Sequence, residues 1–378
     1  MWGNAFMNNY VKLLGIGACL PGNPIKFEDI NNYIGQIPNA PKKIKTWISR
    51  VQPIMKEMLG IDYCYYAFNG KTRKFDEDNL SLSVKASKLA LQDAKIKPQD
   101  IDLLIYAGNY SYQMPPISTR IQEELGIDIC SEYHIHSNCS SIYKAIKLAD
   151  TFLKSGEYKN ALVVSSMVSS AHFIPEYYNQ QKVTKEDVFL RWYLCDGAGA
   201  VVLSSKDTVD NGFYLKNTYV ESAGGKKESV MGNNFPSYFS NPLTAYENGE
   251  HHIRQVTLDK MRKYVVDENG KTIFYNALKR MLDKQKIDLS TLKYFMVNMP
   301  SKFVREYITN ECVGLGISPD KFYSVSQKIG YAGPPAAIIS LDRLLKNNDF
   351  KNNDLIFSFV LEVSKFMQGG FTIQYIKE

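Results

Sequence analysis

The sequence lacks several features that would place it in a familiar class of protein. Its six cysteines include no Cys-x-x-Cys pair, which argues against a zinc site and against a disulfide framework. No run approaches the roughly 18 apolar residues that a membrane-spanning helix requires. The first residues lack the basic-then-apolar layout of a secretory leader, so we expect a cytoplasmic protein with reduced thiols and no membrane contact.

Dense clusters of charge and cofactor motifs are also missing. The net charge is only +6, and no basic cluster with interleaved aromatic residues argues for nucleic-acid binding. A small positive balance suits an acidic partner or the phosphates of coenzyme A, and it equally suits an ordinary surface. The segment 196–199 contains two glycines, but it lacks the spacing of a dinucleotide-binding motif and continues as a strand. We therefore predict no metal and no nicotinamide or flavin cofactor.

What the sequence does contain is one structural plan that occurs twice. Two segments that begin at Leu91 and Leu282, 191 residues apart, each read as the end of an amphipathic helix, a short loop and a buried strand. Two further segments, at Asp150 and Asp342, lie 192 residues apart and each read as a helix followed by a strand. Generic α/β periodicity would not hold the offset constant, so we predict an internal duplication.

The duplication predicts the fold class and the division of the chain. Strands that alternate with helices indicate an α/β protein with parallel sheets covered by helices. Two such halves, related by a pseudo-twofold axis, would form stacked α-β-α-β-α layers. We assign residues 1–205 to the first half and 206–378 to the second. Because no low-complexity linker separates the halves, we expect one compact unit.

Cys139 is the strongest candidate for chemistry. It lies between an expected strand and an expected helix, where the unpaired amides and the positive end of the helix dipole favour a thiolate. A nucleophilic cysteine needs such a setting, although many cysteines are simply buried structural residues. The helix that follows carries apolar residues at i, i+3, i+4 and i+7 spacing, namely Ile142, Ala145, Ile146, Ala149, Phe152 and Leu153.

The order of motifs resembles the ketoacyl-acyl-carrier-protein synthase III family over nearly the whole chain. The matching motifs are the opening strand and Leu-Pro turn at 11–21, the strand and Pro-Pro loop at 101–116, Asn-Cys-Ser at 138–140, Asp-Gly-Ala-Gly-Ala at 196–200 and Gly-Gly-Phe at 369–371. The resemblance implies a thiolase fold in which Cys139 accepts an acyl group. It also implies that acyl-coenzyme A or an acyl carrier protein is the partner, with the coenzyme A or phosphopantetheine thioester as substrate carrier and not as a bound cofactor.

The resemblance breaks at the residues that assist the cysteine. The family uses a Cys-His-Asn triad, whose histidine and asparagine stabilise the developing enolate or oxyanion. Here Asn298 occupies the histidine position, and Tyr331, which follows Gly330, occupies the asparagine position. Asn298 can donate a hydrogen bond but cannot take a proton at neutral pH. Losing one such group costs about 10²–10³ in rate, so we expect decarboxylative condensation to be weak.

The predicted site combines these positions with three further candidates. By the duplication, Tyr331 is the counterpart of Cys139, 192 residues later. The family's Gly-rich turn, which contributes an amide to the oxyanion hole, corresponds to 362–366. The predicted catalytic residues are Cys139, Asn298 and Tyr331, and the oxyanion or tunnel candidates are Ser364, Gly330 and His172.

The remaining histidines offer no obvious substitute for the missing one. We expect His134 and His136 to pack in the core, because they lie within the strand before Cys139. His251 and His252 lie in a polar stretch that reads as a loop or helix start. An alignment shifted by one loop would leave an ordinary synthase, and contact of His251 or His252 with Cys139 would support that interpretation.

Two main interpretations of function stay open. The first is an acyltransferase or atypical condensing enzyme, in a specialised-metabolite or fatty-acid-derived pathway. The second is a catalytically degraded subunit that supports an active paralogue in a heterodimer. Relatives of this type are usually homodimers, and the apolar segment 161–168 resembles the strand that joins their subunits edge to edge. An apolar edge strand needs a partner.

Overall fold

One ten-stranded sheet organises the chain, and its strand order repeats. The computed structural model describes residues 10–109, 113–233, 241–256, 266–298 and 301–377. The strand order is β14-β13-β15-β16-β10-β1-β9-β8-β6-β7. Read outward from the β1–β10 joint, each half places its first, fifth, fourth, second and third strands in the same sequence. The internal duplication is therefore built into the sheet.

The two groups of strands correspond in order, and β14, with two residues against six in β7, is the one strand much shorter than its counterpart. The first group comprises β1 (Tyr10–Cys19), β6 (Leu103–Gly108), β7 (Ser131–His136), β8 (Asn160–Met167) and β9 (Gly197–Lys206). The second comprises β10 (Gly212–Ser222), β13 (Leu292–Val297), β14 (Phe322–Tyr323), β15 (Leu355–Glu362) and β16 (Met367–Ile376). Residues 207–211 connect the groups, close to the predicted boundary. The division into domains 1–205 and 206–378 stays a prediction.

The expectation of parallel sheets is only partly correct. In each half, three strands run parallel, with β6 between β7 and β8 and β13 between β14 and β15. The other ladders, including β8–β9, β15–β16 and both ladders of β1, are antiparallel. For β15 and β16 the reason is the tight turn that joins them, since such a turn permits only an antiparallel pair.

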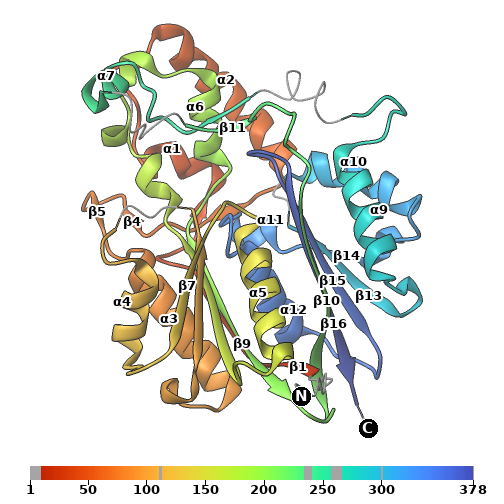
Figure 1. Cartoon of the computed structure of the whole chain (residues 1–378). Coiled ribbons are helices and arrows are strands. Elements are labelled where there is room, and N and C mark those ends of the chain that lie inside the picture. The colour runs from red at the N-terminus through yellow and green to blue at the C-terminus, as the bar shows by residue number, and fades with distance from the viewer. Residues whose placement is uncertain (1–9, 110–112, 234–240, 257–265, 299–300, 378) are drawn as a thin grey trace.

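The helices form three layers around the strands (Figure 1). Helices α3 (Asn79–Ala94) and α4 (Ile117–Leu125) cover one outer face, and α9 (Ile273–Gln285) and α10 (Lys302–Val313) cover the other. Between the two groups of strands lie α5 (Ser141–Ser155) and α12 (Ala336–Asn347). The predicted α/β fold with α-β-α-β-α layers is therefore confirmed.

The central helices are held by apolar faces and by close contact with glycines. Ile142, Ala145 and Ala149 of α5 are fully buried, as the apolar spacing predicted. A Cβ atom on Gly369 would lie 2.5 Å from Cβ of Tyr143, so only glycine lets β16 approach α5 this closely. Likewise a Cβ atom on Gly199 would lie 2.7 Å from Cβ of Ile338 on α12.

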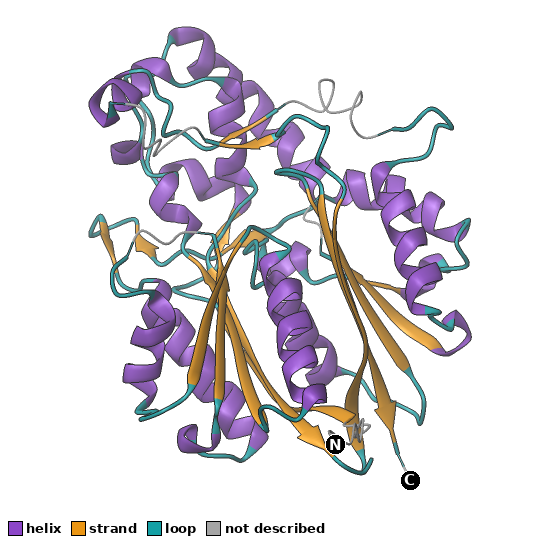
Figure 2. Cartoon of the chain, in the orientation of Figure 1, coloured by secondary structure: helices purple, strands orange, loops and turns teal. Residues whose placement is uncertain are grey.

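One long helix and several shorter elements form a cap above the strand ends (Figure 2). Its helices are the 18-residue helix α2 (Lys42–Leu59) and the short helices α1 (Ile30–Tyr33), α6 (Lys185–Phe189), α7 (Pro242–Glu247) and α11 (Ser326–Ile329). Short strand pairs are β2 (Ile25–Lys26) with β3 (Tyr63–Cys64), β4 (Phe68–Asn69) with β5 (Lys74–Phe75), and β11 (Met231–Gly232) with β12 (Arg254–Gln255). Within the described ranges, no helix is both long and apolar enough to cross a membrane.

The prediction that 161–168 forms an edge strand is wrong. This segment is β8, which lies between β6 and β9 and is buried along its whole length. Its apolar run reflects burial on both faces of an interior strand. Over the part of the chain that the structure describes, the edges of the sheet are β7 and β14. The homodimer itself stays a prediction.

Candidate active site

Cys139 lies in the turn between β7 and α5, beside three tyrosines. The Tyr331 hydroxyl is close enough to the sulfur to lower the pKa of Cys139, and the cysteine in turn affects the pKa of the Tyr193 and Tyr143 phenols. The rings of Tyr193 and Tyr331 meet edge to face, with centroids 5.9 Å apart. Cys139 is half-buried, and the aromatic side chains beside it have hydroxyl groups that can donate hydrogen bonds.

The thiol is not activated in this arrangement. Burial raises the pKa of Cys139 to about 12, and the nearby Glu362 carboxylate adds to the rise, while the Tyr331 hydrogen bond opposes it. The expectation that the start of α5 favours a thiolate therefore stays a prediction, which burial of the sulfur opposes. The main cause of the raised pKa is burial of the sulfur, and the Glu362 carboxylate at the start of the helix adds to it.

Glu362 lies at the end of β15. Its Oε2 accepts hydrogen bonds from the Ser140 amide at 2.9 Å, the Ser140 hydroxyl at 2.6 Å and the Ser137 hydroxyl at 3.0 Å. Its Oε1 accepts from the Ser364 hydroxyl at 2.5 Å. Lys144 Nζ donates to the Ser137 hydroxyl at 2.8 Å, so a cation reaches the carboxylate through one serine. Glu362 is only 1% exposed.

Sequence reasoning missed Glu362. It falls at the start of the segment that corresponds to the family's Gly-rich turn, and only its neighbour Ser364 was selected. The available signal was an acidic residue at the end of the apolar strand Leu355–Leu361, where a buried charge is expensive unless it is paired. Ser364 joins the site through this carboxylate, and its own carbonyl accepts from the Val230 amide at 3.1 Å.

Tyr331 reaches Cys139 because Gly330 turns the chain sharply. Gly330 has φ +69° and ψ −155°, a conformation that is almost confined to glycine. A Cβ atom on Gly330 would lie 2.8 Å from the sulfur of Cys195. The Tyr331 carbonyl then accepts from the Cys195 amide at 3.0 Å, which fixes the tyrosine ahead of α12. The two residues that correspond under the duplication, Cys139 and Tyr331, therefore meet in the structure.

Asn298 follows β13 and faces the same region. Its backbone amide donates to the Phe359 carbonyl at 2.9 Å, which continues the pairing of β13 with β15. Its side-chain Nδ2 is buried, and no described residue accepts a hydrogen bond from it, although the amide is close enough to the Tyr143 hydroxyl to lower the pKa of that phenol. The adjacent Tyr143 hydroxyl is paired with the Ser358 hydroxyl at 2.8 Å. An unpaired buried donor is expensive, and Asn298 is therefore ready to bind an acceptor atom.

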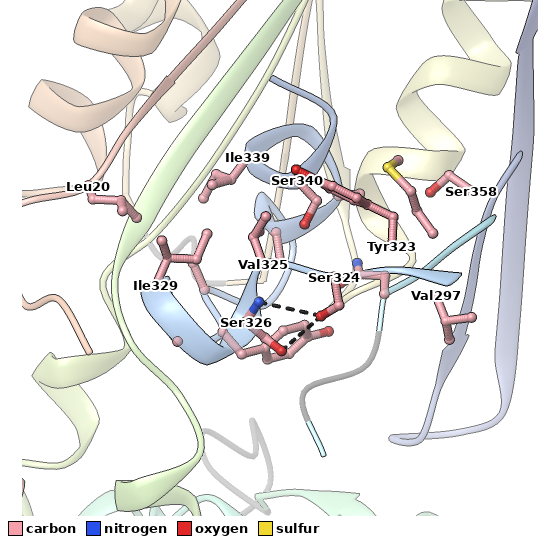
Figure 3. Close-up of a pocket in the computed structure, with 17 residues that line it drawn as sticks. Leu20, Val297, Tyr323, Ser324, Val325, Ser326, Ile329, Ile339, Ser340 and Ser358 are labelled. Atoms are coloured by element: carbon pink, nitrogen blue, oxygen red, sulfur yellow. Dashed lines mark hydrogen bonds between the residues drawn. The ribbon is translucent and has the colours of Figure 1, made fainter. Parts of the chain in front are cut away.

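A narrow pocket connects Asn298 with Tyr331 (Figure 3). Val297 and Ser358 lie on one side, and Leu20, Ile329 and Ile339 lie on the other. At its base the Ser326 amide donates to the Ser324 hydroxyl at 3.4 Å, and the two hydroxyls are 3.0 Å apart. The remaining lining residues are Met296, Asn298, Tyr323, Val325, Gly330, Tyr331, Ala332, Ala336, Ala337 and Ser340. Apolar side chains with a few polar groups are typical of a binding pocket.

The histidines take other places. His172 packs edge to face on Tyr177 with centroids 5.0 Å apart, and burial lowers its pKa to about 4. His252 accepts from the Asn179 amide at 3.0 Å through Nε2, and its Nδ1 lies 3.4 Å from Asp187. Nε2 of His251 lies 2.7 Å from the Tyr177 carbonyl oxygen. These contacts commit His251 and His252 to the 177–187 segment, and they do not support a role for either residue at Cys139.

The prediction that both strand histidines pack in the core is wrong for His136. It is exposed, and His134 is half-buried with its ring 5.1 Å from Tyr106. The reason is that β7 is an edge strand with partly exposed faces.

The Asp-Gly-Ala-Gly-Ala motif has a structural explanation. Asp196 is fully buried and accepts from the Ala67 amide at 2.8 Å, the Ser170 amide at 2.9 Å and the Ser169 hydroxyl at 3.0 Å. Burial raises the pKa of Asp196 to about 6. The carboxylate thus holds two loops against β9, and Gly199 admits α12. No cluster of potential metal ligands occurs among the residues that the structure describes.

Comparisons with known proteins agree on the fold. Residues 133–224 match the family model for 3-oxoacyl-[acyl-carrier-protein (ACP)] synthase III. The chain is 26% identical over 356 residues to the beta-ketoacyl-[acyl-carrier-protein] synthase III of Clostridium perfringens, covering 91% of this chain and 93% of that protein. The tetronic acid condensing enzyme AbyA1 superposes with a TM-score of 0.76 at 18% identity, over 96% of this chain and 99% of that one. OleA from Xanthomonas campestris gives a TM-score of 0.75 at 17% identity, over 97% and 99% respectively.

Proposed function

We propose that this chain, a thiolase-fold protein of the ketoacyl synthase III-like type, carries an acyl group on Cys139 and passes it to a second substrate. The observation that carries the proposal is the meeting of Cys139 and Tyr331 beside the unpaired amide of Asn298. The three residues come from both halves of the chain. They supply a nucleophile and two hydrogen-bond donors, which is the minimum for acyl transfer from a thioester.

The proposed first step is transthioesterification. The Cys139 sulfur attacks the carbonyl carbon of an acyl thioester, and the thiol proton passes to the departing thiolate of the carrier. The tetrahedral oxyanion takes hydrogen bonds from Asn298 Nδ2 and from a tyrosine hydroxyl, for which Tyr331 is the nearest candidate. The carrier is acyl-coenzyme A or an acyl carrier protein, and we propose no bound metal or redox cofactor.

The second step differs from standard decarboxylative condensation. Asn298 and Tyr331 can stabilise an oxyanion, but neither supplies the cationic donor or base of a histidine. We therefore propose acyl transfer, or a Claisen-type condensation with an acceptor that provides its own nucleophile. The relatives named above include synthases and a tetronic acid condensing enzyme, which fits a role in fatty-acid-derived or specialised-metabolite synthesis.

A second candidate function is a non-catalytic subunit that supports an active paralogue in a heterodimer. The raised pKa of Cys139 favours this alternative, because a thiol is a weaker nucleophile than a thiolate. The retained pocket with its unpaired donor favours the enzyme.

Intact-mass spectrometry separates the two functions. The reduced protein is incubated with a panel of acyl-coenzyme A and acyl-carrier-protein thioesters of different chain lengths, with Cys139→Ala as the matched control. An enzyme gains the mass of one acyl group, the gain disappears in Cys139→Ala, and the preferred chain length identifies the donor. If folded, reduced protein gains no mass from any donor, the subunit interpretation replaces the enzyme.

A further inference from the structure

Glu362 places a negative charge next to the proposed reaction centre. Four donors point at its two carboxylate oxygens, from Ser140 twice, Ser137 and Ser364. Such a set is the environment of an ionised carboxylate, which only accepts hydrogen bonds. Ser140 directly follows Cys139, so the anion lies within one residue of the nucleophile. Because the site is buried, solvent screens this charge poorly.

The other charged and titratable groups do not cancel this charge. From α5, Lys144 reaches Glu362 through the Ser137 hydroxyl, and burial lowers the pKa of this lysine while Glu362 opposes the shift. The titratable side chains that face Cys139 are the phenols of Tyr143, Tyr193 and Tyr331, for which burial raises the pKa in every case. These phenols are therefore neutral at ordinary pH, and Lys144 is already shared with Glu362.

We infer that Glu362 is a specificity-determining residue, which excludes an acyl acceptor that carries a free carboxylate beside its reacting carbon. A malonyl thioester is such an acceptor. Its carboxylate would enter a poorly screened site beside a fixed negative charge, and like charges a few ångströms apart in such a site repel strongly. The acceptor is therefore a neutral carbon, oxygen or nitrogen nucleophile. This inference rests on the proposed role of Cys139 as the acyl carrier.

The geometry explains why the charge acts at this position. The family resemblance places a Gly-rich turn here, and the structure has instead a carboxylate bonded to the first turn of α5. The Ser140 amide is one of the donors that an incoming anion would use at a helix N-terminus. Glu362 already occupies that amide. The Glu362 carboxylate therefore repels an anionic substrate, and it also occupies the Ser140 amide that could otherwise donate a hydrogen bond to that substrate.

A pair of alkylating reagents tests this without any thioester. Iodoacetamide and iodoacetate present the same iodomethylene carbon, and they differ by a neutral amide against a carboxylate. In each case a sulfur–carbon bond forms at Cys139, iodide leaves and the thiol proton goes to solvent. The rates are measured by peptide mass spectrometry at Cys139, so labelling of the other five cysteines does not interfere.

Glu362→Gln keeps the shape of the side chain and removes the charge. We expect the ratio of the iodoacetate rate to the iodoacetamide rate to rise at least about tenfold in this variant. The matched control is Glu124→Gln, which removes an exposed acid on α4, and it should leave the ratio unchanged. An unchanged ratio in folded Glu362→Gln overturns the inference.

A second variant covers the case in which Glu362→Gln does not fold. Lys144→Met removes the half-buried cation that partly offsets Glu362, so the ratio should fall by about threefold or more. A ratio that stays constant or rises in Lys144→Met also overturns the inference. If the reagents discriminate as expected but no acyl donor adds mass, the proposed function fails and the exclusion of anions at Cys139 stands.

Discussion

The turns that precede α5 and α12 occupy corresponding places in the two halves, and they have acquired opposite chemistry. Before α5 the chain reads Asn138-Cys139-Ser140, and the first turn of the helix binds the Glu362 carboxylate. Before α12 it reads Gly330-Tyr331-Ala332, and the first turn is closed by backbone bonds from Ala336 to Gly333 and from Ile338 to Pro335. Duplication thus preserved the backbone plan, while single residues decided which turn bears a nucleophile and which a donor.

Burial and Glu362 raise the pKa of Cys139, even though the residues of its turn match those of a nucleophile turn. A helix N-terminus stabilises a thiolate only when its amides and dipole are available to the sulfur. At α5 a carboxylate from the other half of the chain has taken that position. Local sequence was sufficient to place Cys139, whereas burial and a residue 223 positions away together raise the pKa of its thiol.

The largest expected effect is in the pH dependence of Cys139. Because burial and Glu362 raise its pKa to about 12, the thiolate fraction should increase about tenfold per pH unit between about pH 7 and pH 10. The iodoacetamide rate at Cys139 should follow this slope without a plateau. Glutathione, measured in parallel, should level off near its ordinary pKa of about 8.5. A plateau at Cys139 below pH 10 would contradict the assignment of a protonated resting thiol.

The second largest effect on the reactivity of Cys139 should come from removing the Tyr331 hydroxyl, which connects the turn before α12 to the turn before α5. Tyr331→Phe deletes the hydroxyl that donates to the Cys139 sulfur and lowers its pKa. We expect the iodoacetamide rate at pH 8 to fall by about tenfold, because a hydrogen bond to the charged form is lost. Tyr323→Phe, in the same pocket, is the matched control and should retain the wild-type rate. Equal rates in wild type and Tyr331→Phe would show that the two turns are not coupled.

The same comparison predicts unequal tolerance of alanine. Gly330→Ala forces a side chain into a conformation with φ +69° and against the Cys195 sulfur, so it should lower the free energy of unfolding by roughly 2–3 kcal/mol. Its counterpart Asn138 has a negative φ, a conformation that alanine adopts without strain. Alanine would lose only the side-chain hydrogen bond that Asn138 Oδ1 accepts from Asn109 at 2.6 Å. Asn138→Ala should lower it by only about 1 kcal/mol. Urea unfolding of both variants measures the difference, and equal losses would refute it.

The smallest expected effect is on the free energy of unfolding, and it concerns one aspartate–lysine pair in each of the central helices α5 and α12. Each carries a buried aspartate paired with a lysine four residues later, Asp150 with Lys154 at 2.8 Å and Asp342 with Lys346 at 2.5 Å. Asp150 also accepts from the Thr218 hydroxyl at 2.8 Å, and no comparable hydroxyl donor to Asp342 is seen among the described residues. Lys346→Met should therefore destabilise by about 1 kcal/mol, against about 0.5 kcal/mol for Lys154→Met.

The stability cost of Lys346→Met should become smaller as the pH falls. Burial raises the pKa of Asp342, so the folded state disfavours the ionised form, and wild-type stability falls as pH rises through that pKa. Lys346 offsets this loss only when Asp342 is ionised. The cost of Lys346→Met, measured by urea unfolding, should therefore shrink toward about pH 4, where an ordinary aspartate begins to protonate. A cost that stays constant from pH 7 to pH 4 would contradict this.

Much of the fold could be predicted from the sequence because the signals are local or periodic. The constant offset between Asp150 and Asp342 predicted the duplication, and the apolar spacing after Cys139 predicted α5. The strand-to-helix position of Cys139 and its correspondence with Tyr331 follow from the same patterns. These features depend on backbone periodicity and side-chain alternation, which a single segment of sequence carries in full.

Tertiary structure alone decided the remaining features, since they depend on partners distant in the chain. The apolar run of β8 is equally consistent with an edge or an interior strand, and only the pairing with β6 and β9 places it inside. Burial and Glu362 together raise the pKa of Cys139, and the Glu362 side chain meets Ser140 at the start of α5 only when the two halves pack together. Burial and charge act through space, and for this reason the chemistry of the nucleophile could not be read from its own turn.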